Sequence, residues 1–218
     1  MPDPALDRRP LASRNTRWAN ALAGALARRR VSPNAISVAG LVVGSLAGAA
    51  FAATASADGW AARAGWLAGA ACVQLRLLAN LLDGMVAVAS GRTSKLGELF
   101  NEVPDRLSDA ATLIGLGYAA GGVPELGYLA AVGALLTAYV RAVGKAAGAP
   151  SVFAGPMAKP HRMALVTVTA VACAALPAEW VNGYHVAGWA LGVVVAGTVV
   201  TVVRRLARVA ARLREPGP

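Results

Sequence analysis

Two groups of oxygen-bearing side chains stand near the middle of the chain. Asn80 and Asp83 are three residues apart, so on a helix they share one face. A second group recurs every four residues, and its members are Asn101, Asp105 and Asp109. Carboxylate and amide oxygens are the ligands that hard divalent cations prefer. Two facing helices would aim these oxygens at one point, where Mg²⁺, Mn²⁺ or Ca²⁺ could bind together with the oxygens of a phosphate.

Small residues accompany these oxygens at Gly84, Ala87 and Gly97. Because they have no bulky side chains, they leave space in which a nucleotide base or a diphosphate could approach the backbone. A second interpretation also fits the pattern, namely a solvated loop followed by acidic residues that interact favourably with the start of a helix.

Long apolar segments must position these residues. Of the 218 residues, 56% are hydrophobic and 15% are charged, whereas an ordinary soluble domain has about 25% charged residues. A bilayer core about 30 Å thick needs about 20 apolar residues in a helix. Six segments reach or approach this length: 36–55, 60–82, 107–122, 125–143, 163–178 and 184–203. The sequence therefore predicts an all-α integral membrane protein with six transmembrane helices and excludes a globally disordered chain.

The basic residues predict the orientation of these helices. The net charge is +10, and Lys and Arg gather before the first segment, between the second and third, between the fourth and fifth, and after the sixth. The positive-inside rule then places both termini in the cytoplasm, as in a multi-pass protein of the cytoplasmic (inner) membrane. Such a charge in a soluble protein would suggest nucleic acid, but no aromatic residues interleave with a basic stripe, so we expect no nucleic-acid partner.

The N-terminal region is expected to lie on the membrane surface. Within residues 13–30, Trp18, Leu22 and Leu26 recur every four residues among arginines, which is typical of an interfacial amphipathic helix; a soluble tail is the alternative. The predicted organisation has three parts: a cytoplasmic N-terminus with this helix over 1–35, a six-helix membrane domain over 36–205 and a basic cytoplasmic tail over 206–218.

Glycines indicate where helices pack. Gly40, Gly44 and Gly48 recur every four residues in the first apolar segment. Small residues on one face let helix backbones approach closely in lipid. We expect these three glycines, and also Gly188 and Gly192 in the last segment, to lie in helix contacts.

The polar segment resembles the signature of the CDP-alcohol phosphotransferase family of integral membrane enzymes, D-x2-D-G-x2-A-R-x8-G-x3-D-x3-D. The positions that match are Asp83, Gly84, Ala87, Gly97 and Asp105. The positions that depart from it are Asn80 and Asn101, each in place of an aspartate, and Val88 in place of the arginine. The resemblance extends over nearly the whole chain and is weakest in the last apolar segment.

The resemblance implies a membrane transferase of phospholipid biosynthesis. Such an enzyme moves a phosphatidyl or related phospho-alcohol group from a CDP-linked lipid donor, expected here to be CDP-diacylglycerol, to a small alcohol or phospho-alcohol, and releases CMP. It also implies a homodimer and a Mg²⁺ or Mn²⁺ cofactor. The implied metal ligands are Asn80, Asp83, Asn101 and Asp105. Asp105 is also the implied catalytic base, and Gly84, Ala87 and Gly97 would border the cytidine diphosphate.

The two asparagines remove two of the four negative charges of the signature. We therefore expect weaker metal binding, with one ion held well instead of two. Three neighbouring acidic residues could return some of this charge: Glu98, Glu102 and Asp109.

A second candidate site consists of cations near the loop between the fourth and fifth segments, Arg141, Lys159 and Arg162. They could bind the phosphate of an acceptor through charge-assisted hydrogen bonds. The alternative is plain positive-inside charge.

Two other functions compete with catalysis. The departures at Asn80, Val88 and Asn101 would also fit a degenerate relative that binds a CDP-lipid without turnover. A small transporter or scaffold is the other alternative, but it would be expected to show charges at mid-bilayer or broken helices in paired repeats, and neither is clear.

Overall fold

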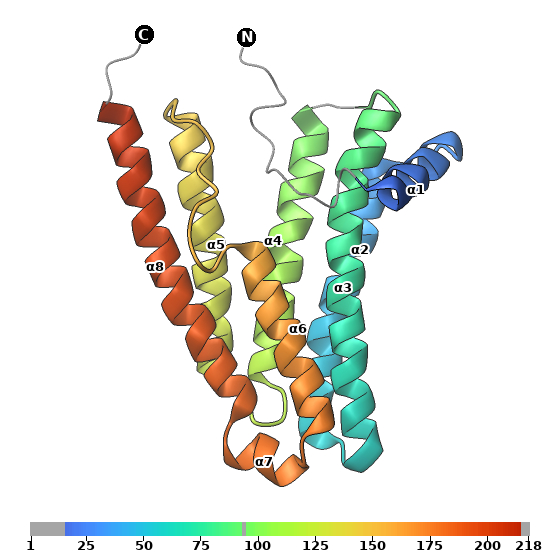
Figure 1. The fold of residues 1–218 in the computed structure, drawn as a ribbon, viewed down its shortest axis with the longest axis vertical. Coiled ribbons are helices and arrows are strands. Elements are labelled where there is room, and N and C mark those ends of the chain that lie inside the picture. Colours follow the sequence, from blue (N-terminus) through green and yellow to red (C-terminus); the bar gives the residue numbers. More distant parts are fainter. Residues whose placement is uncertain (1–15, 93–94, 215–218) are drawn as a thin grey trace.

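The computed structural model of the chain describes residues 16–92 and 95–214. These residues form only helices, turns and irregular segments, and they contain no strand, which confirms the all-α prediction. The elements in chain order are α1 (Arg17–Arg28), α2 (Pro33–Ala53), the short 3₁₀ helix η2 (Thr54–Ser56), α3 (Gly59–Ala89), α4 (Lys95–Gly117), α5 (Pro124–Ala146), α6 (Lys159–Ala175), α7 (Ala178–Gly183) and α8 (Val186–Arg214). The long helices run up and down in one bundle, which α7 closes at one end (Figure 1).

Four helical segments in the described part of the chain are long and apolar enough to cross a membrane. They are Pro33–Ser56, α3, α5 and α8. The other two long helices of the bundle depart from this pattern. Helix α4 carries many polar residues, among them Glu102, Asp105 and Asp109, and α6 has only 17 residues. The chain is thus a membrane protein, whereas the crossing of the bilayer by all six helices stays a prediction.

The helices around the polar cluster extend beyond the apolar segments. Helix α3 continues to Ala89, past the expected end at 82, and α4 begins at Lys95, well before the expected start at 107. An apolar window stops at the first polar residues, whereas the helices themselves continue through them. Asn80 and Asn101 therefore both lie inside helices. Pro104 also lies inside α4.

Glycines bring α2 and α4 into close contact. A Cβ atom built at Gly48 would lie 2.2 Å from the carbonyl oxygen of Ala111, and one at Gly115 would lie 2.2 Å from that of Gly48. The predicted packing role is confirmed for the glycines of α2. Gly188 also packs, with its Cβ position 2.8 Å from Val123, but the prediction for Gly192 is wrong, because nothing lies within 4 Å of a Cβ at that position.

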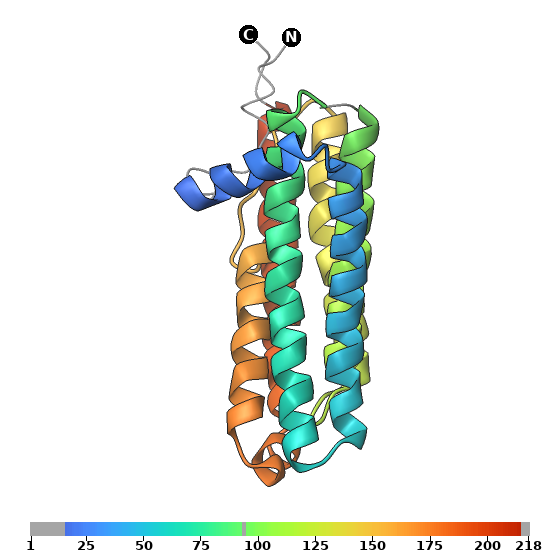
Figure 2. The same cartoon turned by 90° about the vertical axis from the view of Figure 1, so that its right-hand side faces the viewer.

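Helix α1 lies across the end of the bundle, beside α3 (Figures 1 and 2). Its Ala23 packs against Leu82 and Val86 of α3, whereas Trp18 is 53% exposed. The structure has a helix over Arg17–Arg28 where the sequence predicted one over 13–30, and residues 13–15 lie outside the described residues. Its position on a membrane surface stays a prediction.

The segment between α5 and α6 brings residues 147–158 down the side of the bundle, so that α6 begins part-way along it (Figure 1). Two residues of α8 hold this segment. Arg205 Nε donates to the carbonyl oxygen of Ala154 at 2.9 Å, and Thr201 Oγ1 accepts from the backbone N–H of Met157 at 3.0 Å. Helix α8 runs through the predicted boundary at 205 and reaches Arg214.

Candidate functional site

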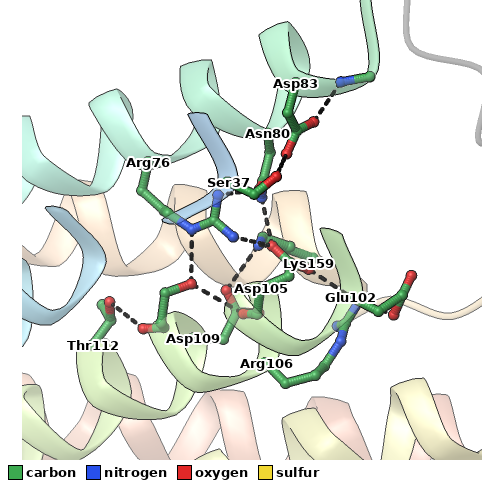
Figure 3. Close-up of polar contacts among 12 residues, drawn as sticks. Ser37, Arg76, Asn80, Asp83, Glu102, Asp105, Arg106, Asp109, Thr112 and Lys159 are labelled. Atoms are coloured by element: carbon green, nitrogen blue, oxygen red, sulfur yellow. Dashed lines mark hydrogen bonds and ion pairs between the residues drawn. The ribbon is translucent and has the colours of Figure 1, made fainter. Parts of the chain in front are cut away.

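The polar cluster lies between α3 and α4, near the end of the bundle that carries α1. Figure 3 shows Asn80 of α3 directed at Asp105 of α4, with Lys159 of α6 beside Asp105, whereas the carboxylate of Asp83 is directed at Ser37 of α2. The two helix faces that the sequence spacing defines therefore do meet. Ser37 and Lys159 enter the cluster because α2 and α6 pack on either side of α3.

Asp83 is buried at 3% exposure. Its Oδ2 accepts a hydrogen bond from Ser37 Oγ at 2.8 Å, and its Oδ1 accepts one from the backbone N–H of Gly84 at 2.6 Å. These neutral donors fix the direction of the carboxylate without neutralising its charge.

Asp105 is surrounded by cations. Its Oδ1 accepts from Arg76 Nη2 at 2.8 Å and from Lys159 Nζ, and its Oδ2 lies 3.0 Å from Arg106 Nη2. Asn80 Nδ2 also donates to Oδ1, at 2.6 Å. Asp105 is only 6% exposed, and a buried carboxylate with several charge-assisted hydrogen bonds is held in one position and in its ionised form.

Arg76 occupies the centre of the cluster and is 3% exposed. Its Nε donates to Ser108 Oγ at 2.7 Å, its Nη1 donates to Asn80 Oδ1, and its Nη2 binds Asp105. The sequence analysis missed Arg76, and it also missed Ser37 and Arg106. A signal was present, because an ionisable residue inside an apolar segment, one helical turn before Asn80, is a functional candidate by default.

A second layer of ion pairs surrounds this centre. Asp109 Oδ1 lies 2.9 Å from Lys159 Nζ, and its Oδ2 lies 2.7 Å from Arg162 Nη2. At the edge of the cluster, Glu102 pairs with Arg141 at 2.6 Å and with Arg106 at 2.9 Å. Three of the predicted site residues thus belong to this layer, with Lys159 in contact with both Asp105 and Asp109.

The candidate acceptor-binding cations differ in burial. The side chains of Arg141 and Lys159 are 23% and 15% exposed, whereas that of Arg162 is 1% exposed. Arg162 also donates to the carbonyl oxygen of Met157 at 3.4 Å. Arg162 therefore joins α6 to α4 in the interior, and only the other two cations are accessible at the cluster surface.

The small residues of the signature lie on the two helices that flank the cluster. A Cβ at Gly84 would meet nothing within 4 Å, so the space beside it is open. Ala87, Gly97 and Asn101 are each half-buried, and Val88, at the signature's arginine position, is 53% exposed. The side chain of Glu98 lies outside the described residues.

An apolar groove of about 410 Å³ lies beside the cluster, between α4 and α5. Its polar lining comes from Glu102 and Arg106, and its apolar lining comes mainly from α5: Val132, Leu135, Leu136, Ala138, Tyr139 and Ala142. Glu102 and Arg106 of the charged cluster thus border a groove whose surface is almost entirely apolar.

The donor set limits how many metal ions the cluster can hold. Among the residues that the structure describes, no three of His, Cys, Asp and Glu gather in a way that could hold a metal ion. Both oxygens of Asp105 already contact cations. Asp83 differs from Asp105, because its described hydrogen bonds come from neutral donors, Ser37 and the backbone of Gly84.

No family model matches the chain. The chain is 30% identical over 203 residues to phosphatidylinositol phosphate synthase of Streptomyces avermitilis, a match that covers 89% of this chain and 78% of the relative. It is 30% identical over 94 residues to archaetidylinositol phosphate synthase of Pyrococcus horikoshii, which covers 42% of this chain and 49% of that protein.

Solved structures of phosphatidylinositol phosphate synthase from Mycobacterium tuberculosis share the fold. The complex with CDP-DAG has a TM-score of 0.74 and 22% sequence identity, with 93% of this chain and 98% of that chain covered. The complex with manganese and citrate has a TM-score of 0.73 at the same identity, with 92% of each chain covered.

The chain belongs to the CDP-alcohol phosphatidyltransferase family. It is an enzyme of that class, a membrane transferase of phospholipid biosynthesis that uses a CDP-linked donor. The family resemblance seen in the signature is confirmed, and the transporter or scaffold alternative is set aside. The roles of the individual site residues stay predictions.

Proposed function

We propose that this chain transfers a phosphatidyl group from a CDP-diacylglycerol lipid to an alcohol that itself carries a phosphate, such as an inositol phosphate. The observation that carries this proposal is the pair of partly exposed cations, Lys159 and Arg141, beside the buried Asp105. The names of the two sequence relatives support it, because both are inositol phosphate lipid synthases.

The donor would bind where charge and apolar surface meet. Its acyl chains would lie along the groove between α4 and α5, and its diphosphate would reach Arg106 at the end of that groove. The cytidine would occupy the open space beside Gly84, bordered by Ala87 and Gly97. The CDP-DAG complex of the Mycobacterium tuberculosis enzyme, which has this fold, supports such a donor.

The acceptor's phosphate would bind Lys159 and Arg141. A phosphate on Lys159 Nζ would compete with Asp105 for this ammonium group, because one cation would then be shared between two anions. Asp105 Oδ1 would then accept the proton of the attacking hydroxyl as general base. Arg162, which is fully buried, would hold the start of α6 at the depth of this reaction and would not touch the acceptor.

A divalent ion, Mg²⁺ or Mn²⁺, is the proposed cofactor. Asp83 would hold it together with the amide oxygen of Asn101, and oxygens of the donor diphosphate would complete its coordination. A bound ion would neutralise the diphosphate and stabilise the leaving CMP. The manganese complex of the Mycobacterium tuberculosis enzyme supports a divalent ion in this fold.

The proposed setting is the inner membrane, with all six long helices spanning it, α1 on its cytoplasmic surface and both termini in the cytoplasm. The basic residues of α1 and of the last turns of α8 support this orientation, because both elements lie at one end of the bundle (Figure 1). We also propose that the chain forms a homodimer, because the family resemblance implies one.

The test incubates the purified chain in detergent–lipid micelles with labelled CDP-diacylglycerol and measures CMP release and the labelled lipid product. Inositol phosphate and glycerol phosphate are compared with free inositol and free glycerol. We expect release only with a phosphorylated acceptor. Equal release with a phosphorylated acceptor and its free alcohol, or none with any of them, would overturn the proposal.

Variants assign the acceptor cations. Lys159→Met and Arg141→Met should raise the KM for the phosphorylated acceptor by about tenfold or more and leave the KM for the CDP-lipid nearly unchanged. Arg63→Met is the matched control, because Arg63 lies near the opposite end of α3. An unchanged acceptor KM in both site variants would remove these cations from the proposed role.

A further inference from the structure

We propose that the guanidinium of Arg76 is a built-in cation that replaces one divalent ion, so that the site binds a single metal ion per chain. This inference rests on the proposed function and concerns how its charge is balanced. Arg76 lies inside α3, bonded to two of the four signature positions that the family resemblance assigns to metal ligands, 80 and 105. A positive charge supplied by the chain thus holds these two positions together.

The hydrogen bonds around Arg76 explain why position 80 carries an amide. Asn80 Oδ1 accepts from Arg76 Nη1, while Asn80 Nδ2 donates to Asp105 Oδ1 at 2.6 Å. An aspartate could accept from the guanidinium, but it has no N–H to donate to Asp105, and its charge would repel that carboxylate. Asn80 and Arg76 therefore act together. The guanidinium supplies a positive charge at the position where the first aspartate of the signature would bind a metal ion.

The surrounding helices are shaped to hold this guanidinium. A Cβ at Gly40 of α2 would lie 2.7 Å from Arg76 Nη1, so any larger residue at 40 would displace the side chain. Ser108 of α4 accepts from Arg76 Nε. Arg76 is buried at 3% exposure and its three nitrogen atoms all have partners. A charge inside an apolar segment is retained when it has such partners, and it marks a functional site.

The charge balance of the cluster agrees with a single ion. Its described residues include five basic side chains and four carboxylates. The basic side chains are Arg76, Arg106, Arg141, Lys159 and Arg162, and the carboxylates are Asp83, Glu102, Asp105 and Asp109. The cluster is therefore already net positive without a metal. Two divalent ions would add strong repulsion in a buried setting, whereas one ion at Asp83 would bind near the carboxylate whose hydrogen bonds, among the described residues, come from neutral donors.

The test counts metal ions on the purified full-length chain without substrate, by Mn²⁺ titration followed by electron paramagnetic resonance. We expect at most one Mn²⁺ per chain for the wild type. The double variant Asn80→Asp with Asn101→Asp should still bind one, because Arg76 keeps its place against Asp105. Adding Arg76→Gln to this pair should raise the number to two. Two ions on the wild type or on the double variant would overturn the inference.

A second measurement covers the case in which the triple variant does not fold. Arg76→Gln alone should bind Mn²⁺ roughly tenfold more tightly than the wild type, whereas Arg76→Lys, which keeps the charge, should not. Arg63→Gln, a charge removal near the other end of α3, controls for net charge. Equal Mn²⁺ affinity in Arg76→Gln and Arg76→Lys would overturn the inference.

The number of bound metal ions can be measured without turnover. Failure of the metal-ion inference can therefore be distinguished from failure of the proposed transferase function. Release of CMP by a chain that binds two ions would overturn the role of Arg76 and leave the transferase proposal intact. A chain that binds one ion but releases no CMP with any acceptor would overturn the transferase proposal and leave the role of Arg76 intact.

Discussion

Arg162 of α6 and Asp109 of α4 form an ion pair in the interior of the bundle, with 2.7 Å between Nη2 and Oδ2 and side-chain exposures of 1% and 3%. The pair joins the two helices at the level of Asp105, because Lys159 contacts both aspartates from the same turn of α6. The position of the accessible ammonium group thus depends on a pair that a substrate cannot reach.

Arg162→Met should destabilise the protein strongly. The substitution leaves the buried carboxylate of Asp109 without its guanidinium partner, and breaking a buried ion pair in this way costs about 3–5 kcal/mol. The measurement is thermal unfolding of the purified protein in detergent.

The control for this prediction is the double variant Arg162→Met with Asp109→Leu. Because it removes both charges, it should recover much of the lost stability. An unfolding temperature of Arg162→Met equal to that of the wild type would contradict a structural role for the pair.

Asp105→Asn should lower the rate of CMP release by about 10²- to 10⁴-fold, the usual contribution of a positioned general base. The amide keeps the shape of the carboxylate but removes the counter-charge of Arg76 and Lys159, so the rate is measured on the fraction that elutes as a folded protein in size-exclusion chromatography. Asp58→Asn is the control, because Asp58 is exposed and precedes α3 at the opposite end of the bundle. Retention of full activity by Asp105→Asn would exclude Asp105 as the base.

Gly48→Ala should cost about 1–3 kcal/mol of stability, because the new methyl group would overlap the carbonyl oxygen of Ala111 and force α2 away from α4. Gly192→Ala is a matched control in α8, where nothing lies within 4 Å of the new Cβ. That substitution should be neutral or slightly stabilising, since alanine favours helix over glycine. Comparison of the two unfolding temperatures checks the prediction, and equal values would contradict it.

Arg205→Met should impair the acceptor side of the reaction more than the donor side. Arg205 donates to the carbonyl oxygens of Ala154 and Thr137, and so fixes the segment that leads into Lys159. We expect the acceptor KM to rise several-fold while the KM for the CDP-lipid stays nearly constant. Arg208→Met, an exposed site on the same helix, is the control. A change confined to the KM for the CDP-lipid would show that Arg205 supports donor binding and not acceptor binding.

The sequence predicted the bundle well, because apolar length and turn residues are local properties. Every expected apolar segment lies within or overlaps a helix of the structure, and Asn80 does meet Asp105 as the two spacings implied. The limits of α3 and α4 were less predictable, since both helices continue past their apolar segments into polar residues that an apolar window excludes.

The sequence marks Arg76 as a candidate, but its partners could not be predicted for a different reason. Its role depends on the rotation of α3 relative to α2 and α4, which decides whether the side chain points at lipid or at Asp105. The sequence shows that Arg76 and Asn80 are one turn apart, but the third partner comes from another helix. The burial of Arg162 likewise follows from α6 beginning part-way along the bundle, which no local pattern encodes.

The buried contact between Arg76 and Asp105 also has a consequence for biosynthesis. The two residues are 29 positions apart, so the ribosome completes the helix that carries the arginine before it makes the aspartate. A lone arginine costs about 2.5–3.5 kcal/mol at the centre of a lipid-exposed helix. The contact with Asp105 offsets this cost, so α3 gains stability in the bilayer once α4 packs beside it.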